Sequence, residues 1–235
     1  MHHYYLRMDT IFRSETETRT FLKKLKDELL LSLPGVDAHL RLAPEIRVND
    51  IKEGITPDHA QESAVLIILY PLNRQLYTVV ILRNEYDGAH SGQISLPGGK
   101  AEKSDVDFIH TALREAQEEI GIIPSKMEII GQLSRFYVRP SNFIIYPYIA
   151  YCAWRPDFHP DPTEVQRVIE IDIMNEISLE KIVNKTITFR NLLQVNAPGF
   201  EISGEFMWGA TAMIFSELIQ VLKNVLDKSD NNQAD

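Results

Sequence analysis

The chain has 235 residues, of which 44% are hydrophobic and 24% charged, values typical of a soluble globular protein with a sizeable core. Its net charge of −9 argues against non-specific binding of nucleic acid, which requires a basic surface. One cysteine permits no internal disulfide, and no apolar run is long enough to span a bilayer. We therefore expect a cytoplasmic protein with no nucleic-acid partner and no membrane partner.

The N-terminal part predicts one helix followed by loops. An amphipathic helix is predicted, beginning near Thr16 and stopping before residues 33–35, from the spacing of Phe21, Leu22, Leu25, Leu29, Leu30 and Leu31. This helical extension, over about residues 10–33, is expected to pack on the core or on a second subunit, so a homodimer stays open. Residues 36–62 are polar and broken by proline and glycine, which predicts loop and short turns.

Strands dominate the next part of the chain. Apolar runs at 64–70 and 78–83 predict an antiparallel pair buried on both faces, and a short strand at 93–96 leads to Gly98 and Gly99. Further strands are expected at 127–132 and 143–150 and between 161 and 171. The C-terminal third predicts a short helix at 179–183, short strands at 186–189 and 200–202, an amphipathic helix to about residue 226, and a disordered polar tail, 227–235. No linker is visible, so we expect one domain over residues 1–235.

The stretch 108–120 predicts a helix with a cluster of carboxylates. Residues three and four apart share one face of a helix, so Glu115, Glu118 and Glu119 gather on one side, away from the apolar residues. Like charges at this spacing repel each other, and a hard cation such as Mg²⁺ removes the conflict. A solvated acidic face is the alternative. The glycines at 98 and 99 before the helix and Gly121 directly after it favour a functional site.

These residues carry a family resemblance. Gly99, followed by Arg114-Glu115-Ala116-Gln117-Glu118-Glu119-Ile120-Gly121-Ile122, resembles the signature of the Nudix hydrolases, which places the signature at 99–122. The chain departs from the pattern by one additional residue before Arg114 and by Asp105 in place of the first glutamate. Both departures, with Pro97-Gly98-Gly99-Lys100 and Thr111-Ala112-Leu113 before Arg114, resemble the coenzyme A pyrophosphatase branch. Residues 208–212, Trp-Gly-Ala-Thr-Ala, also resemble that branch, and we interpret Trp208 as a packing residue.

The resemblance implies an α/β fold: a Nudix-type α/β/α sandwich with a mixed β-sheet, to which the N-terminal helix is added. It also implies metal-dependent hydrolysis of a diphosphate bond with Mg²⁺ or Mn²⁺ as cofactor. Glu115, Glu118 and Glu119 are the expected metal ligands. Arg114 would orient a carboxylate, and Glu118 or Glu164 would take the proton of the attacking water.

The expected substrate is a small-molecule nucleotide. By resemblance it is coenzyme A or an acyl derivative, cleaved to adenosine 3′,5′-bisphosphate and phosphopantetheine. Gly98 and Gly99 would admit the diphosphate against the backbone, and Arg83 would contact a phosphate. Four positions depart from the branch, namely Ile81, Asn84, Leu96 and Gly88, the last of which replaces an arginine.

Two alternatives stay open. One is an ADP-ribose or dinucleotide pyrophosphatase. The other is a ligand-sensing regulator with a DNA-reading C-terminal module, which the intact carboxylate set and the absence of a basic C-terminal helix disfavour.

Overall fold

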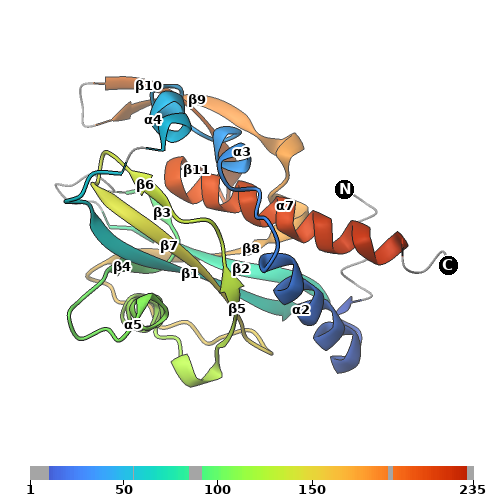
Figure 1. Cartoon of the computed structure of the whole chain (residues 1–235). Helices are drawn as coiled ribbons and strands as arrows, with labels where there is room; N and C mark the ends of the chain where they lie inside the picture. Colours follow the sequence, from blue (N-terminus) through green and yellow to red (C-terminus); the bar gives the residue numbers. More distant parts are fainter. Residues whose placement is uncertain (1–10, 55, 85–91, 190–192, 232–235) are drawn as a thin grey trace.

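A computed structural model describes residues 11–54, 56–84, 92–189 and 193–231. A mixed sheet of eight strands lies between helix α5 (Phe108–Ile120) on one face and helices α2 (Glu15–Leu29) and α7 (Gly209–Asn231) on the other (Figure 1). The expected α/β/α sandwich with an added N-terminal helix is therefore confirmed.

The centre of the sheet is strand β1 (Gln61–Leu72). It pairs in antiparallel fashion with β2 (Gln75–Arg83) and in parallel with β7 (Phe143–Tyr151), in the order β3-β2-β1-β7-β5. The remaining strands of this sheet are β3 (Ile94–Ser95), β4 (Gly98–Lys100), β5 (Glu128–Gln132), β6 (Phe136–Val138) and β8 (Val165–Asp172). Since β4 pairs with β1, the glycine turn lies directly against the central strand.

The continuous apolar runs of β1 and β2 follow from burial on both faces, as the sequence predicts. On β1, Leu66 and Ile68 belong to the apolar cluster under α5, whereas Ile67 and Leu69 belong to the larger cluster under α2 and α7. Successive strand residues point to opposite faces, so a strand covered on both sides needs no polar alternation.

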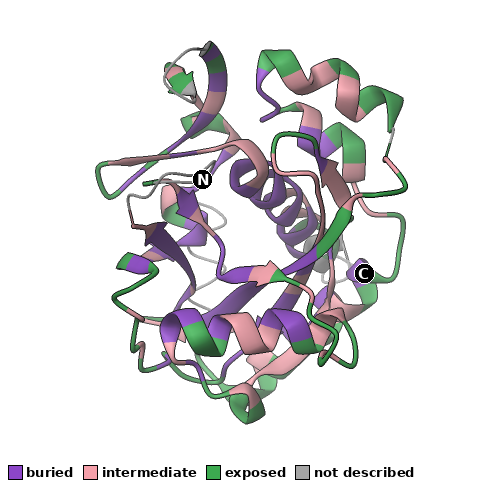
Figure 2. Cartoon of the chain, turned by 90° about the vertical axis from the view of Figure 1, so that its left-hand side faces the viewer, coloured by how far each residue is buried: buried purple, intermediate pink, exposed green. Residues whose placement is uncertain are grey.

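Helices α2 and α7 cover the second face together. Ser14 caps α2 by accepting a hydrogen bond from the backbone of Glu17 at 3.2 Å. Most of the predicted apolar stripe is buried, but Leu30 and Leu31 follow the end of the helix and are exposed. Figure 2 shows the buried residues gathered in the interior, where the first part of α7 runs. The helix extends to Asn231, beyond the expected end at residue 226, so the tail expected to be disordered is helical up to that point.

Residues 36–62 differ from the expected loop. They contain α3 (Gly35–Leu40), the 3-10 helix η1 (Glu45–Arg47) and α4 (Val48–Glu53). Gly54, with φ of +62°, ends α4 in the left-handed conformation. The glycine that reads as a loop residue is thus a helix boundary. Five short elements were also not predicted: the strands β4, β6 and β11 (Glu205–Trp208), the helix α6 (Ile173–Glu176) and the 3-10 helix η2 (Pro124–Lys126).

A second, three-stranded sheet follows the 3-10 helix η3 (Leu179–Lys181). It consists of β9 (Val183–Phe189), β10 (Leu193–Ile202) and β11 (Glu205–Trp208) in the order β11-β10-β9. Strands β10 and β11 contact α7, and β11 also contacts β3. The C-terminal third thereby reaches the edge strand β3, which directly precedes the glycine turn in the chain. Within the part of the chain described, no helix combines the length and apolar character that crossing a bilayer demands.

Candidate active site

The glycine turn needs its two glycines for different reasons. Gly98 has φ of +150°, and a Cβ atom there would lie 2.3 Å from the carbonyl oxygen of Ala64 and 2.6 Å from Cα of Val65. A Cβ atom at Gly99 would instead lie 2.4 Å from a carboxylate oxygen of Glu115. Gly98 lets two backbones meet, and Gly99 lets a carboxylate of α5 rest against the turn.

Helix α5 is fixed at both ends. The Asp107 carboxylate caps its start by accepting a hydrogen bond from the backbone of His110 at 2.7 Å, and Gly121 ends it in the predicted left-handed conformation, with φ of +70°. The backbone N–H groups of His159 and Asp161 donate to the last carbonyl groups of the helix, each at 2.9 Å. The segment that contains His159 and Asp161 therefore lies against the C-terminal end of α5. Glu164 follows this segment directly and so lies close to the helix.

Glu119 is buried at the centre of the site. One carboxylate oxygen accepts a hydrogen bond from the backbone N–H of Gly98 at 2.8 Å, and the other accepts one from Arg83 Nη2 at 2.7 Å. Burial raises the pKa of Glu119 to about 7, although Arg83 and Gly98 oppose the shift and the charges of Glu115 and Glu164 add to it. The carboxylate thus joins α5 to the glycine turn.

Arg83 is held within the protein. Besides its contact with Glu119, its Nη2 donates to the carbonyl oxygen of Gly98 at 3.2 Å and its Nε donates to Ser95 Oγ at 3.1 Å. The predicted contact of Arg83 with a phosphate stays a prediction. What the geometry adds is a positioning role, because Arg83 fixes both Glu119 and the turn.

Arg114 organises the other carboxylates. Its Nε and Nη2 donate to the two oxygens of Asp105, each at 3.0 Å, and Nη2 also donates to the carbonyl oxygen of Lys100. Its Nη1 donates to Glu115 at 2.9 Å and to Glu118 at 3.1 Å. The hydrogen bonds from Arg114 hold the pKa of the Asp105 carboxyl far below its usual range.

Asp105 is a residue to which the sequence analysis gives no role. Its side chain is buried, and it also accepts hydrogen bonds from Thr111 Oγ1 and the backbone of Glu102, each at 2.9 Å. Its place at the first acidic position of the signature is the signal that could have identified it. In this chain the residue anchors Arg114.

The three predicted metal ligands differ in their environments. Glu115 lies half-buried against Gly99, and burial raises its pKa even though Arg114 lowers it. The side chain of Glu118 is 62% exposed. Glu164 is exposed, and its charge acts on Glu115 and Glu119. The structure therefore places Glu115 and Glu119 against the glycine turn, and Arg114 joins Glu118 to Glu115.

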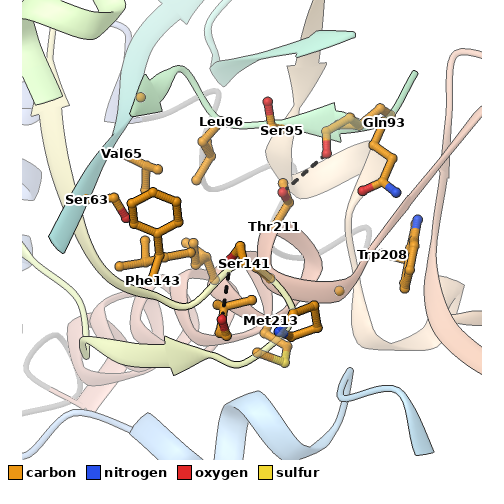
Figure 3. A pocket seen from close by; sticks show the side chains of 18 of the residues that line it. Ser63, Val65, Gln93, Ser95, Leu96, Ser141, Phe143, Trp208, Thr211 and Met213 are labelled. Carbon is orange, nitrogen blue, oxygen red and sulfur yellow. Dashed lines mark hydrogen bonds between the residues drawn. The ribbon is translucent and has the colours of Figure 1, made fainter. Parts of the chain in front are cut away.

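A pocket of about 330 Å³ opens beside this turn. Its lining includes Arg83, Gly98, Gly99 and Lys100, and apolar side chains make up most of the rest. In the close-up (Figure 3), Val65 and Phe143 lie on one side, and Trp208 and Gln93 on the other. Trp208, which we interpreted as a packing residue, is thus a pocket residue. Gly88 lies outside the described residues, so its departure from the branch pattern has no structural account.

Comparison with known proteins identifies the family. The model of the NUDIX domain matches residues 60–189, which is more than half of the chain. The chain belongs to the Nudix family. It is a hydrolase of phosphoanhydride bonds in nucleoside diphosphate derivatives, and enzymes of this family generally depend on a divalent metal ion.

Two relatives and one solved structure illustrate the similarity of this Nudix hydrolase to others. It is 31% identical to an uncharacterized Nudix hydrolase NudL of Pectobacterium atrosepticum. The 184 matched residues are 76% of this chain and 88% of the relative. A NudL of Yersinia enterocolitica is 32% identical over 59% of this chain and 70% of its own. A Nudix hydrolase of M. smegmatis, RenU, has the same fold, with a TM-score of 0.50 and 13% identity over 70% of this chain and 87% of its own.

The carboxylates of this Nudix hydrolase suit a divalent cation in kind but do not converge. Among the described residues, no group of three or more His, Cys, Asp or Glu side chains is arranged to hold a metal ion. Glu119 turns toward Gly98 and Arg83, while Glu118 extends outward. Burial is the main cause of the raised pKa values of Glu115 and Glu119, and the neighbouring carboxylates add to it. Carboxylate oxygens are the ligands that Mg²⁺ and Mn²⁺ prefer. The donor set therefore fits such an ion.

Proposed function

We propose that this Nudix hydrolase cleaves the diphosphate bond of coenzyme A or an acyl-coenzyme A. The products are adenosine 3′,5′-bisphosphate and phosphopantetheine. The observation that carries the proposal is the position of the pocket. Its lining includes Arg83 and the glycine turn, which lie beside the carboxylates, and is otherwise largely apolar. We call this largely apolar part of the pocket the chamber. The resemblance of Pro97-Gly98-Gly99-Lys100 and of residues 111–116 to the coenzyme A branch supports the same substrate.

Glu115, Glu118 and Glu119 are the residues that would hold Mg²⁺ or Mn²⁺. When bound, the ion neutralises phosphate charge and lowers the pKa of a coordinated water. A rotation of Glu118, whose side chain is exposed, would bring its carboxylate toward that of Glu115, and Arg114 already joins both. Arg114 thus orients these carboxylates through its hydrogen bonds, and Asp105 holds Arg114 in place.

In the reaction, the oxygen of a water molecule forms a bond to one phosphorus as the bond from that phosphorus to the bridging oxygen breaks. The bridging oxygen leaves with the other phosphate. The proton of the water passes to Glu118 or Glu164, both of which are exposed carboxylates at the site. The buried Glu119 is instead occupied by Arg83 and Gly98.

Gly98, Gly99 and Arg83 form the proposed binding place of the diphosphate. Among the described contacts of Arg83, Nε and Nη2 are used within the protein and Nη1 is not, so Nη1 is the nitrogen that would donate to a phosphate oxygen. Lys100, which follows the glycine turn and also lines the pocket, supplies a second cation. A cytoplasmic location and a homodimer that uses the N-terminal helix are further parts of the proposal.

A substrate panel tests the assignment. We would measure kcat/KM for coenzyme A, an acyl-coenzyme A, ADP-ribose and NADH with Mg²⁺ or Mn²⁺, and identify the products by mass in ¹⁸O-labelled water. Coenzyme A or its acyl derivative should have the highest kcat/KM, and one product should carry one ¹⁸O atom. A tenfold preference for ADP-ribose or NADH would overturn the coenzyme A assignment and leave the hydrolase standing.

The variant Glu118→Gln provides the mechanistic test within that panel. It should lower kcat by roughly two to four orders of magnitude for every substrate, because it removes charge that acts in the transition state. Its melting temperature should stay close to that of the wild type, since the side chain is 62% exposed. Near-normal turnover in Glu118→Gln would contradict its assignment. A large loss in Glu164→Gln alone would identify Glu164 as the proton acceptor.

A further inference from the structure

Several polar side chains that line the chamber beside the glycine turn are engaged within the protein. Three hydroxyl groups in its lining donate to backbone carbonyl oxygens: Ser63 to Ile144 at 3.1 Å, Ser141 to Val138 at 3.3 Å and Thr211 to Ile94 at 3.3 Å. Figure 3 shows Ser141 and Thr211 in these contacts. With their protons engaged, these residues present mainly carbon to the chamber.

Most of the remaining lining is apolar, although Arg47, Arg83, Gln93, Ser95 and Lys100 also contribute to it. Val65, Leu96, Phe143, Ile145 and Met213 line the chamber, and the side chain of Ile46 lines it while remaining 54% exposed. A large apolar side chain that is exposed at the rim of an apolar chamber gains contact area when a ligand covers it. The lining therefore favours carbon chains over sugars, whose hydroxyl groups would lose water without finding partners.

Two walls of the chamber come from outside the part of the chain that the family model matches. Pro44, Ile46 and Arg47 precede residue 60, and the stretch from Trp208 to Ile214 follows residue 189. The turn and the carboxylates, in contrast, all lie within residues 60–189. The catalytic half of the site thus belongs to the common domain, and the chamber is closed by segments added to it.

We propose that this chamber binds an apolar chain carried by one phosphate of the substrate, and that it makes the enzyme select alkyl-bearing diphosphates over sugar-bearing ones. The inference rests on the proposed function for the place of the diphosphate at Gly98 and Gly99. Arg83 and Lys100, which would face the phosphates, line the same pocket as Ile46, so a chain attached to a phosphate could reach Ile46. The specificity-determining residues are Ile46, Phe143 and Met213.

A series of simple esters tests this selectivity without coenzyme A. The probes are ADP esters with methyl, n-butyl and n-hexyl groups on the β-phosphate, with ADP-ribose as the sugar-bearing comparison. Burial of one methylene corresponds to about a fourfold gain in affinity, so kcat/KM should rise by about 30-fold or more from methyl to hexyl if half of the five added methylenes are buried. The gain should appear mainly in KM. A flat series, or ADP-ribose above the hexyl ester, would overturn the proposal.

Two variants locate the chain. Ile46→Ser should reduce the methyl-to-hexyl gain several-fold, whereas Ile123→Ser should leave the gain unchanged, because Ile123 is equally exposed at 55% but does not line the chamber. Equal gains in both variants would place the chain elsewhere.

A binding measurement separates this inference from the proposed function. Calorimetry with the α,β-methylene analogues of the same esters reports the dissociation constant without turnover. A gain in affinity with chain length, lost in Ile46→Ser, would support the chamber even if no ester were hydrolysed. Hydrolysis of every ester with no dependence on chain length would support the hydrolase and reject the chamber.

Discussion

At the scale of single residues, Gly98 and Gly99 show how neighbours of one type serve different ends. Both were expected from the sequence as places where the backbone approaches a ligand. The space around Gly98 is filled by the backbone of β1, whereas the space around Gly99 is filled by the movable end of the Glu115 side chain. The first glycine is thus required by the fold, and the second by the position of a carboxylate.

Substitution by alanine should separate these two requirements. Gly98→Ala should destabilise the protein by about 3 kcal/mol or more, since its Cβ would overlap backbone atoms at a positive φ. Gly99→Ala should cost about 1 kcal/mol and lower kcat by roughly 100-fold, because it displaces Glu115. Urea unfolding and steady-state kinetics on both variants would check this. Equal losses of stability would contradict the distinction.

Asp105 offers a second test at this scale. Asp105→Asn leaves the guanidinium of Arg114 without its two-oxygen partner, which should destabilise the fold by about 3 kcal/mol and lower kcat as Arg114 loses its orientation. Asp107→Asn is the matched control, because asparagine caps a helix as well as aspartate does. Its free energy of unfolding should change by less than about 0.5 kcal/mol. If Asp105→Asn behaved like the control, Arg114 would not need this anchor.

At the scale of elements, the helices and strands that could be predicted from the sequence are those with a long apolar pattern. β1, β2, α2 and α5 carry long apolar patterns that report burial on one or both faces, and they were expected. The helices α3 and α4 are six residues each and bounded by proline or glycine, so their sequence resembles a loop. The chamber could not be predicted, because its lining comes from η1, β1, β7 and α7, which meet only in the fold.

The hydrogen-bonded contact between α3 and α7 could likewise not be predicted from the sequence. It yields a prediction about stability at acidic pH. Glu217, fully buried on α7, accepts hydrogen bonds from the backbone of Gly35 (2.9 Å), from Ser134 Oγ (2.6 Å) and from the Ser134 backbone (3.1 Å), and lies 3.2 Å from His39 Nε2. Burial alone would raise the pKa of Glu217, but the hydrogen bonds from His39, Ser134 and Gly35 outweigh it and lower the pKa below its ordinary value.

A carboxyl whose pKa is lower in the folded state stabilises the protein above its unfolded pKa, about 4.3 for glutamate. That stability should be lost as the pH falls from about 4.3 through the folded pKa. Glu217→Gln should therefore cost about 2–3 kcal/mol at pH 7 and show a weaker loss of stability below pH 4.3 than the wild type. The free energy of unfolding measured from pH 7 to pH 3 would check this, with the exposed Glu201→Gln as control. Parallel curves for wild type and Glu217→Gln would contradict it.

At the scale of the whole molecule, a chain of net charge −9 must attract an anionic substrate. The cations at the site are few, and Arg83 and Arg114 are already paired with carboxylates. Besides Lys100, bound Mg²⁺ or Mn²⁺ would supply positive charge there, and the ion would bind the folded state alone. Metal binding should therefore appear as a gain in global stability.

Millimolar Mg²⁺ or Mn²⁺ should raise the melting temperature. At a metal concentration of about 100 times Kd the linkage is about 2.7 kcal/mol, or roughly 5–10 °C for a chain of this size. The rise should largely disappear when Glu115, Glu118 and Glu119 are all changed to Gln. Differential scanning fluorimetry across a metal titration would measure both.

The control for this experiment must match the change in charge, because neutralising three carboxylates anywhere brings the net charge from −9 to −6. Glu53, Asp58 and Glu180 are exposed and far along the chain from the signature, so their neutralisation changes the net charge and leaves the site intact. This control variant should keep the full metal-induced rise if the ion is bound at the site. If both triple variants lost the rise equally, the metal would act as a diffuse counterion to the acidic surface. If both kept it, the ion would be bound at residues other than Glu115, Glu118 and Glu119.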